Sequence, residues 1–262
     1  MPGNYQNVIF DLYGTLIRIR TDLDSMEPWR RLAYHLSAYG AEYTPAGVKK
    51  AYYRFMKDEN RKLSVKYQTE WPEFQVEKVL ERMVKEAPKK HTARLYGPDE
   101  ETLYRDLSQI RRTLTMRDFK LYRGALQLID RLHAEGRKVY LLSNAQAVFT
   151  IPELERTDLY TRFDGIYISS DFGYRKPDPR FMKGMLEEYG MKAEETVFIG
   201  NDYRSDVPSA AAGNVDCIYI NSYKRSVSER KAAREAIHER YPDYDLRRIT
   251  EVRSLLAAGK LL

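Results

Sequence analysis

Apolar residues along this 262-residue chain follow two kinds of pattern, short continuous runs and helical repeats. Runs rich in β-branched and aromatic residues predict five strands, at residues 7–12, 138–142, 165–169, 196–199 and 217–220. Helical patterns of apolar residues lie between the last four runs. Strands that alternate with helices predict an α/β fold, which is a parallel sheet with helices on both faces. The tail, residues 226–262, predicts two more helices around a turn-like Tyr-Pro-Asp segment.

The stretch from Arg20 to Arg117 interrupts this alternation, because it contains no convincing strand pattern. Four helical segments are predicted within it, at residues 28–39, 45–66, 72–87 and 98–114. A crossover of this length is far longer than a strand–helix–strand unit needs. We therefore predict an inserted all-helical domain at residues 20–117. Residues 1–19 and 118–262 form the predicted core.

Composition favours a soluble protein of a reducing compartment. Apolar residues make up 43% of the chain, enough for a sizeable core, yet no run approaches the length of a membrane span. The first six residues are polar and predict no secretory signal. The single cysteine, Cys217, lies in an apolar run and predicts a buried, inert thiol. We expect a cytoplasmic protein without a membrane partner.

The net charge favours an anionic ligand. Lysine and arginine number 44 against 38 aspartates and glutamates, which gives +6. Such an excess suits a phosphate ester, although it is also common on an ordinary solvated surface. The sequence has no compact basic run with interleaved aromatics and no zinc spacing, so no nucleic-acid partner is expected. The sequence leaves the oligomeric state open.

Residues suited to catalysis follow the carboxyl ends of four predicted strands. They are the groups Asp11-Leu12-Tyr13-Gly14-Thr15, Ser143-Asn144, Lys176-Pro177-Asp178-Pro179 and Gly200-Asn201-Asp202-Tyr203-Arg204-Ser205-Asp206. Each group alone has a plain structural explanation as a turn, a cap or a solvated loop. Open parallel sheets bind ligands where the carboxyl ends of their strands meet, so we expect the four groups to converge.

The chemistry of these groups is mutually consistent. The Asp11 carboxylate can attack a phosphorus or carbon centre and form a covalent intermediate. Ser143 and the amides of the following helix start could hold an anionic oxygen. The Lys176 ammonium would neutralise the nucleophile and the transferred group. Asp202 and Asp206, together with Asp11, offer the hard oxygen ligands that Mg²⁺ prefers.

The four motifs, in this order, resemble the haloacid dehalogenase (HAD) superfamily over residues 4–16 and 119–221. The resemblance implies a Rossmann-like core with a helical cap inserted after the first motif. It implies Asp11 as the nucleophile, Ser143 as a phosphate-binding hydroxyl and Lys176 as the stabilising cation. We assign Thr15 and Asn144 to substrate binding as well.

The resemblance also implies Mg²⁺ held by Asp11, by the backbone carbonyl of Tyr13 and by an acidic residue of the fourth motif. Family members usually place that acid directly after the glycine, where this chain has Asn201. Asp202 can supply the ligand if the loop bulges by one residue. Asp206 would then bind the ligand residues and would not contact the metal directly. The candidate metal residues are Asp11, Tyr13, Asn201, Asp202 and Asp206.

Tyr13 departs from the phosphatases of the superfamily, which usually carry a second aspartate there as general acid and base. A tyrosine, with an ordinary pKa of about 10, is a poor base at neutral pH. Tyr13 resembles the metal-independent 2-haloacid dehalogenase branch. However, a metal-free site would not need Asp202 and Asp206, and the segment near Trp29 lacks that branch's substrate clamp.

We therefore predict a Mg²⁺-dependent phosphatase that acts on a small-molecule phosphate ester, with Asp11, Tyr13 and Lys176 as catalytic residues. One alternative is a metal-independent 2-haloacid dehalogenase that uses the same Asp11. Another is a HAD-like binding protein that has lost its activity.

Overall fold

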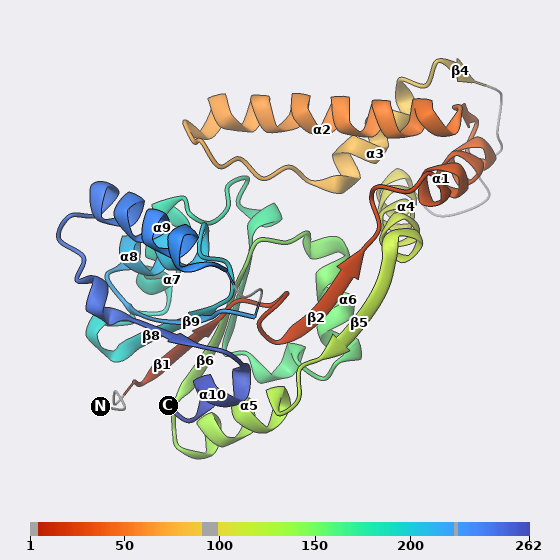
Figure 1. Cartoon of the computed structure of the whole chain (residues 1–262). Coiled ribbons are helices and arrows are strands. Elements are labelled where there is room, and N and C mark those ends of the chain that lie inside the picture. Colours follow the sequence, from red (N-terminus) through yellow and green to blue (C-terminus); the bar gives the residue numbers. More distant parts are fainter. Residues whose placement is uncertain (1–4, 91–98, 223–224) are drawn as a thin grey trace.

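The computed structural model describes residues 5–90, 99–222 and 225–262, and its centre is a parallel sheet (Figure 1). Six strands lie in the order β10-β9-β8-β1-β6-β7, and each pairs in parallel with its neighbours. Their bounds are Asn7–Phe10 (β1), Lys138–Ser143 (β6), Gly165–Ile168 (β7), Thr196–Gly200 (β8), Asp216–Ile220 (β9) and Ile249–Val252 (β10). The five predicted strands and the α/β fold are confirmed.

Helices cover both faces of the sheet, so its central strands are buried on both sides. One face holds α5 (Ala125–Ala134), α6 (Ala147–Arg156) and α10 (Leu255–Gly259), and the other holds α7 (Pro179–Glu188), α8 (Asp206–Gly213) and α9 (Val227–Arg240). Along β1, Phe10 packs into the first layer, whereas Ile9 packs into the second. Burial on both sides explains the uninterrupted apolar runs of the sequence.

The register aligns the carboxyl ends of the strands that bear the motifs. On β1, Phe10 pairs with Leu141 of β6 on one side and with Ile199 of β8 on the other. The strand order reverses at β1, because the following core strand, β6, lies on one side and β8 on the other. Such a reversal opens a crevice at the carboxyl edge of a parallel sheet. Asp11 is the first residue after β1 and so lies at that crevice.

A two-stranded antiparallel ribbon leads the chain out of the core and back (Figure 1). It consists of β2 (Ile17–Thr21) and β5 (Met116–Leu121). Between them lie α1 (Glu27–Ala38), α2 (Pro45–Tyr67), α3 (Val76–Lys85) and α4 (Glu100–Thr115), which share an apolar cluster of their own. Thr44 caps α2 by accepting from the Gly47 N–H at 3.1 Å, as its position before Pro45 predicts.

Two features of the insertion and the tail differ from the predictions. The insertion contains a two-residue strand pair, β3 (Ala41–Glu42) with β4 (Lys89–Lys90), so it is not wholly helical; this pair does not join the central sheet. The tail contains one long helix, α9, followed by the edge strand β10 and the short helix α10. In β10 one residue, Ile249, is fully buried, so the strand has too little apolar pattern to be recognised.

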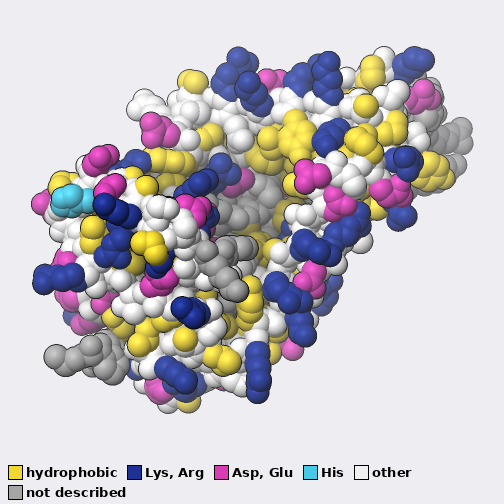
Figure 2. Space-filling view, viewed as in Figure 1, with side chains coloured by type: hydrophobic (Ala, Val, Ile, Leu, Met, Phe, Trp, Pro, Cys, Tyr) yellow, Lys and Arg dark blue, Asp and Glu magenta, His cyan; other side chains and the backbone are white. Residues whose placement is uncertain are grey.

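Charged side chains of both signs are interspersed over the face shown in Figure 2. No helix within the described parts of the chain is long and apolar enough to cross a bilayer. Cys217 is buried in β9, as its apolar neighbours predict.

Candidate active site

The structure brings the motif residues together around a cavity of about 280 Å³ at the carboxyl edge of the sheet. Its lining comprises Asp11, Tyr13, Asn144, Lys176, Asn201, Asp202, Ser205, Asp206 and Arg225. All four predicted motifs contribute to it, although they are separated by up to 195 residues in sequence. The expected convergence therefore occurs, and Arg225 joins it from the segment after β9.

Lys176 lies at the centre of the buried charges. Its Nζ donates to Asp11 Oδ1 at 2.7 Å and to the Leu142 carbonyl at 2.8 Å, and it forms an ion pair with Asp206 Oδ1 at 2.8 Å. Only 1% of its side chain is exposed. Burial alone lowers the pKa of Lys176, but the charges of Asp11 and Asp206 outweigh burial and raise it. The ammonium therefore remains charged at neutral pH.

Asp11 is held in the orientation of a nucleophile. Its N–H donates to the Ile199 carbonyl at 2.8 Å, and its Oδ2 accepts from Thr15 Oγ1 at 3.2 Å. Burial raises the pKa of Asp11 to about 6, while the Lys176 charge opposes that rise. Thr15 thus contacts the nucleophile itself, and Gly14 provides the turn with a φ of 94°.

Asn201 occupies the position closest to Asp11 in the fourth motif. Its amide lies 3.2 Å from Asp11 Oδ2, from the Tyr13 carbonyl and from Thr15 Oγ1. If the amide nitrogen faces this group, it donates to all three oxygens. The nitrogen orientation satisfies every hydrogen bond without a cation. If the amide oxygen faces the group instead, it meets the acceptors Asp11 Oδ2 and Tyr13 O, and a cation bound there would bridge these oxygens.

The two carboxylates of the fourth motif have other partners. Asp206 Oδ2 accepts from the N–H groups of Asn201 and Asp202, both at 2.8 Å, while its Oδ1 faces Lys176. Asp206 therefore supports the loop and the lysine, and its oxygens are not free to act as ligands. The Asp202 side chain is 46% exposed and accepts from the Arg204 N–H at 2.9 Å. Of the three candidates in this loop, Asn201 lies nearest the nucleophile.

Asn144 lines the cavity and positions Lys176. Its Nδ2 donates to the Lys176 carbonyl at 3.0 Å, and its Oδ1 accepts from the Lys176 N–H at 2.8 Å. Both ends of the amide already have partners, and its role in substrate binding stays a prediction. Nor does Asn144 cap a helix, because α6 begins at Ala147 and its first N–H donates to Ser170 Oγ at 2.9 Å.

Ser143 ends β6, and its hydroxyl is fully buried. Its Oγ has no hydrogen-bond partner among the groups that the structure describes. A buried hydroxyl without a partner typically costs about 1–3 kcal/mol. Ser143 is not among the residues that line the catalytic cavity, and its binding of a ligand oxygen stays a prediction.

The Tyr13 hydroxyl is committed to a network that the sequence did not reveal. It donates to Glu153 Oε2 at 2.5 Å and lies 3.1 Å from Thr150 Oγ1, both on α6. Arg112 of α4 donates to the same carboxylate through Nε at 2.6 Å and Nη2 at 2.9 Å. Burial, and then the Glu153 charge, raise the pKa of Tyr13 far above its ordinary value. The raised pKa and the bond to Glu153 make this hydroxyl a poor general acid at neutral pH, and a catalytic role for Tyr13 stays a prediction.

The segment between α2 and α3 rests on the core beside the motifs. Gln146 Nε2 donates to Glu73 Oε1 at 2.8 Å, and Ser169 Oγ donates to Glu73 Oε2 at 3.0 Å. Thr69 Oγ1 donates to Asp178 Oδ2 at 2.6 Å. Burial raises the pKa of Glu73 to about 7. These polar contacts join residues distant in sequence, and no motif signalled them.

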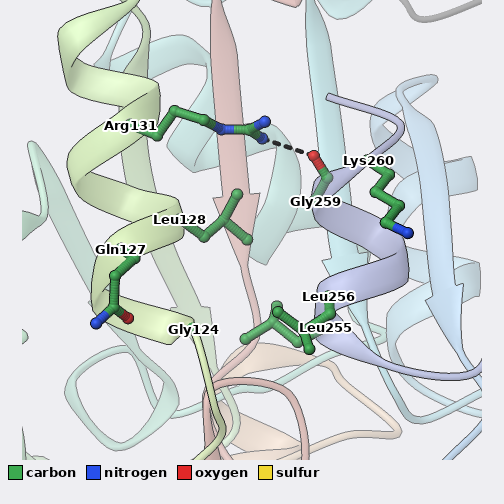
Figure 3. Close-up of a pocket in the computed structure, with 8 residues that line it drawn as sticks. All are labelled: Gly124, Gln127, Leu128, Arg131, Leu255, Leu256, Gly259 and Lys260. Atoms are coloured by element: carbon green, nitrogen blue, oxygen red, sulfur yellow. Dashed lines mark hydrogen bonds between the residues drawn. The ribbon is translucent and has the colours of Figure 1, made fainter.

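A concavity away from the motifs, between α5 and α10, differs from the catalytic cavity in its lining (Figure 3). It measures about 420 Å³, and its described lining contains no carboxylate. Arg131, which lines it, donates to the Gly259 carbonyl at 2.6 Å. It offers neither a nucleophile nor metal ligands, so the reaction chemistry belongs to the cavity at Asp11.

Comparison with known proteins bears directly on this site. Residues 5–214 match the family model of haloacid dehalogenase-like hydrolases, which includes every motif residue described above. The chain belongs to the haloacid dehalogenase-like hydrolases. A glyceraldehyde 3-phosphate phosphatase of Methanothermobacter thermautotrophicus is 30% identical over 95 residues, covering 36% of this chain and 42% of that protein. The chain spans about half the length of the curated relatives it matches.

Solved HAD structures share the whole architecture. A HAD phosphatase from Thermococcus onnurineus aligns with a TM-score of 0.59 at 15% identity, over 98% of this chain and 97% of its own. A 2-haloacid dehalogenase from Pseudomonas syringae pv. Tomato DC3000 aligns with the same TM-score, identity and coverage. At such identity the likeness shows the fold, and it does not choose between the two reactions.

Proposed function

We propose that this HAD hydrolase is a Mg²⁺-dependent phosphatase that acts on a small phosphate ester through a phosphoaspartyl intermediate at Asp11. The observation that carries the proposal is the convergence of four motifs on one cavity. There the Asp11 carboxylate pairs with the buried Lys176 ammonium at 2.7 Å, and Asn201 and Asp202 line the same cavity.

The residues present fit Mg²⁺ when the Asn201 amide turns its oxygen toward Asp11 and the Tyr13 carbonyl. In octahedral geometry with Mg–O distances of about 2.0–2.1 Å, neighbouring ligand oxygens lie roughly 2.9 Å apart. The Asn201 contacts of 3.2 Å with Asp11 Oδ2 and the Tyr13 carbonyl come close to that spacing. We assign the metal to Asp11, Tyr13 O and Asn201, with Asp202 near the cavity mouth. Bound there, Mg²⁺ would supply positive charge against the phosphoryl oxygens.

Residues of the chain itself carry out the attack on phosphorus and stabilise the transferred group. Asp11 attacks phosphorus in line, forming an Asp11–phosphorus bond as the bond to the leaving oxygen breaks. Lys176 neutralises the carboxylate and the transferred group, and the unpartnered Ser143 hydroxyl donates to a phosphoryl oxygen. Water then hydrolyses the phosphoaspartate. Because Tyr13 cannot protonate the leaving group, substrates with good leaving groups should react faster.

Residues 20–117 are proposed to act as a cap that selects the substrate. In support, the chain enters and leaves this unit through one ribbon, and the unit has its own apolar cluster. Arg112 brings the unit into contact with Glu153, which in turn binds Tyr13 of the first motif. A movement of the cap would therefore shift Arg112 and Glu153, and with them the Tyr13 side chain at the catalytic cavity.

The runner-up is a metal-independent 2-haloacid dehalogenase, which Tyr13 favours. The carboxylates of Asp202 and Asp206 in the cavity lining count against it, because attack on neutral carbon needs no divalent cation and gains nothing from them. Relatives with phosphatase names add support to the first reading. We further propose a cytoplasmic location, consistent with the single, buried cysteine.

Hydrolysis of p-nitrophenyl phosphate tests the proposal. Purified protein should release p-nitrophenol with Mg²⁺, and EDTA should stop the release. Chloride release from 2-chloropropionate that resists EDTA, without phosphatase activity, would establish the dehalogenase instead. Absence of both activities would favour a binding protein.

A further inference from the structure

We infer that Arg225, Arg230 and Arg253 form a second anion-binding subsite, so the preferred phosphate ester carries a further anionic group, a carboxylate or a second phosphate. The inference rests on the proposed phosphatase function and specifies its substrate class. It begins with a second cavity, of about 420 Å³, beside the catalytic one. Its described lining consists of Asn221, Ser222, Arg225, Arg230, Glu251 and Arg253.

The two cavities adjoin at Arg225, which lines both. The second cavity lies where β9 and β10 end, at the same edge of the parallel sheet as Asp11. The catalytic cavity alone, at about 280 Å³, is small for an organic substrate, since ligand pockets commonly span roughly 300–1,000 Å³. A substrate whose phosphate is at Asp11 can extend past Arg225 into the second cavity.

The charges of the two cavities differ in sign. The catalytic lining holds three carboxylates, on Asp11, Asp202 and Asp206, against the cations of Lys176 and Arg225. The second lining holds three arginines against the single carboxylate of Glu251. A second anionic group on the substrate would therefore be attracted to the excess of arginines in the second cavity.

Several donors in the second cavity lack acceptors. Arg225 Nε and Ser222 Oγ are buried and have no hydrogen-bond partner among the described groups. The remaining Arg225 nitrogens lie 3.7 Å from Asp202 Oδ1 and 3.8 Å from Glu229 Oε1, beyond good hydrogen-bond length. Buried donors without partners call for an acceptor, and an anionic ligand group would supply one.

Two of the three arginines are held by contacts within the cavity. Asn221 Oδ1 accepts from the backbone N–H of Arg225 at 2.9 Å, and Asn221 Nδ2 donates to Glu251 at 2.9 Å. Glu251 in turn pairs with Arg230. Arg253 is exposed and forms no ion pair with any carboxylate in the described ranges, so its charge is available to a ligand. A group of guanidinium ions of this kind suits carboxylate or phosphate.

The test compares three esters built on one frame. Glycerol 3-phosphate has a neutral remainder, whereas 3-phosphoglycerate adds a carboxylate and glycerol 1,3-bisphosphate adds a phosphate. Wild type should show a higher kcat/KM for at least one of the two acidic esters than for glycerol 3-phosphate. Arg253→Gln should lower that preference roughly tenfold, the size of one charge-assisted hydrogen bond.

Lys231→Gln is the matched control, because Lys231 is an exposed cation of α9 that lines neither cavity. It should leave the preference unchanged. No preference in wild type, an unchanged preference in Arg253→Gln, or an equal fall in Lys231→Gln would each overturn the subsite.

Calorimetry separates failure of the subsite from failure of the phosphatase proposal. Binding of 3-phosphoglycerate and of the bisphosphate needs no turnover and should weaken in Arg253→Gln. If no ester is hydrolysed but this loss of binding occurs, the phosphatase proposal fails and the subsite stands. If neither ligand binds more weakly to Arg253→Gln, the subsite fails whatever the activity.

Discussion

Replacing Lys176 with methionine tests the electrostatic design of the site. The substitution keeps an unbranched apolar stem but removes the ammonium that faces Asp11 at 2.7 Å and Asp206 at 2.8 Å. Both carboxylates then lie buried without their shared counter-ion. Removing one partner of a buried ion pair typically costs about 3–5 kcal/mol. That is a large part of the roughly 5–15 kcal/mol by which domains are stable.

The loss should depend on pH. At pH 8 the Asp11 carboxylate is ionised and lies buried without the ammonium, so the full cost is expected. At pH 5 it should be smaller, because burial raises the pKa of Asp11 and a protonated carboxyl group needs no counter-ion. Urea unfolding followed by circular dichroism, with EDTA present so that no metal replaces the ammonium, measures both values.

Two further variants make the result decisive. Lys192→Met removes an exposed lysine that pairs with Glu195 at 3.0 Å, and it should leave the urea midpoint almost unchanged. If Lys176→Met does not fold at pH 8, adding Asp206→Asn should restore part of the stability. A loss below about 1 kcal/mol at pH 8, or the same loss at both pH values, would refute the reasoning.

Three other predictions follow from the site. Asn201→Asp adds a charged ligand, so it should lower the Kd for Mg²⁺ roughly tenfold in calorimetry. Asp202→Ala should change that Kd little. Weaker Mg²⁺ binding by Asn201→Asp would contradict the metal assignment. Burial raises the pKa of Glu73 from 4.5 to about 7, so its stabilising contribution is complete below pH 4.5 and is lost as the pH rises through 7. Glu73→Gln should therefore gain stability relative to wild type between pH 5 and pH 8, by up to about 3 kcal/mol in urea unfolding, and a difference independent of pH would count against it. Tyr13→Phe should keep kcat for p-nitrophenyl phosphate within about threefold, because the Tyr13 hydroxyl is bound to Glu153. Loss of a true general acid would lower kcat about a hundredfold or more. The free energy of unfolding should fall by about 1 kcal/mol through the lost hydrogen bond.

Local patterns predicted the elements whose two faces are buried. The strands that carry Asp11, Ser143 and Asn201 are continuous apolar runs, because helices cover both sides of the sheet. Convergence of the motifs followed from topology alone, since the carboxyl ends of parallel strands share one edge. The strand β10 was missed because only Ile249 is fully buried there, and β3 and β4 were missed because two residues carry no period.

The partners of the site residues could not be read from sequence. Tyr13 binds Glu153, which lies 140 residues away, and Glu153 also binds Arg112 of a different helix. Asn144 had a plausible local role as a cap, yet its amide pairs with the backbone of Lys176. Such pairings depend on how helices and loops dock, and single-sequence patterns record only which residues are buried and with what period.

The central claim is that Asp11 accepts the phosphoryl group, and trapping the intermediate tests it most directly. Wild-type protein turning over p-nitrophenyl phosphate with Mg²⁺ is quenched in acid and digested, and the peptide that contains Asp11 is examined by mass spectrometry. The account predicts a fraction of that peptide heavier by one phosphoryl group, with fragmentation placing the group on Asp11 and with none in Asp11→Asn. Active protein whose phosphoryl group is found on another residue, or Asp11→Asn that keeps its activity, would contradict it.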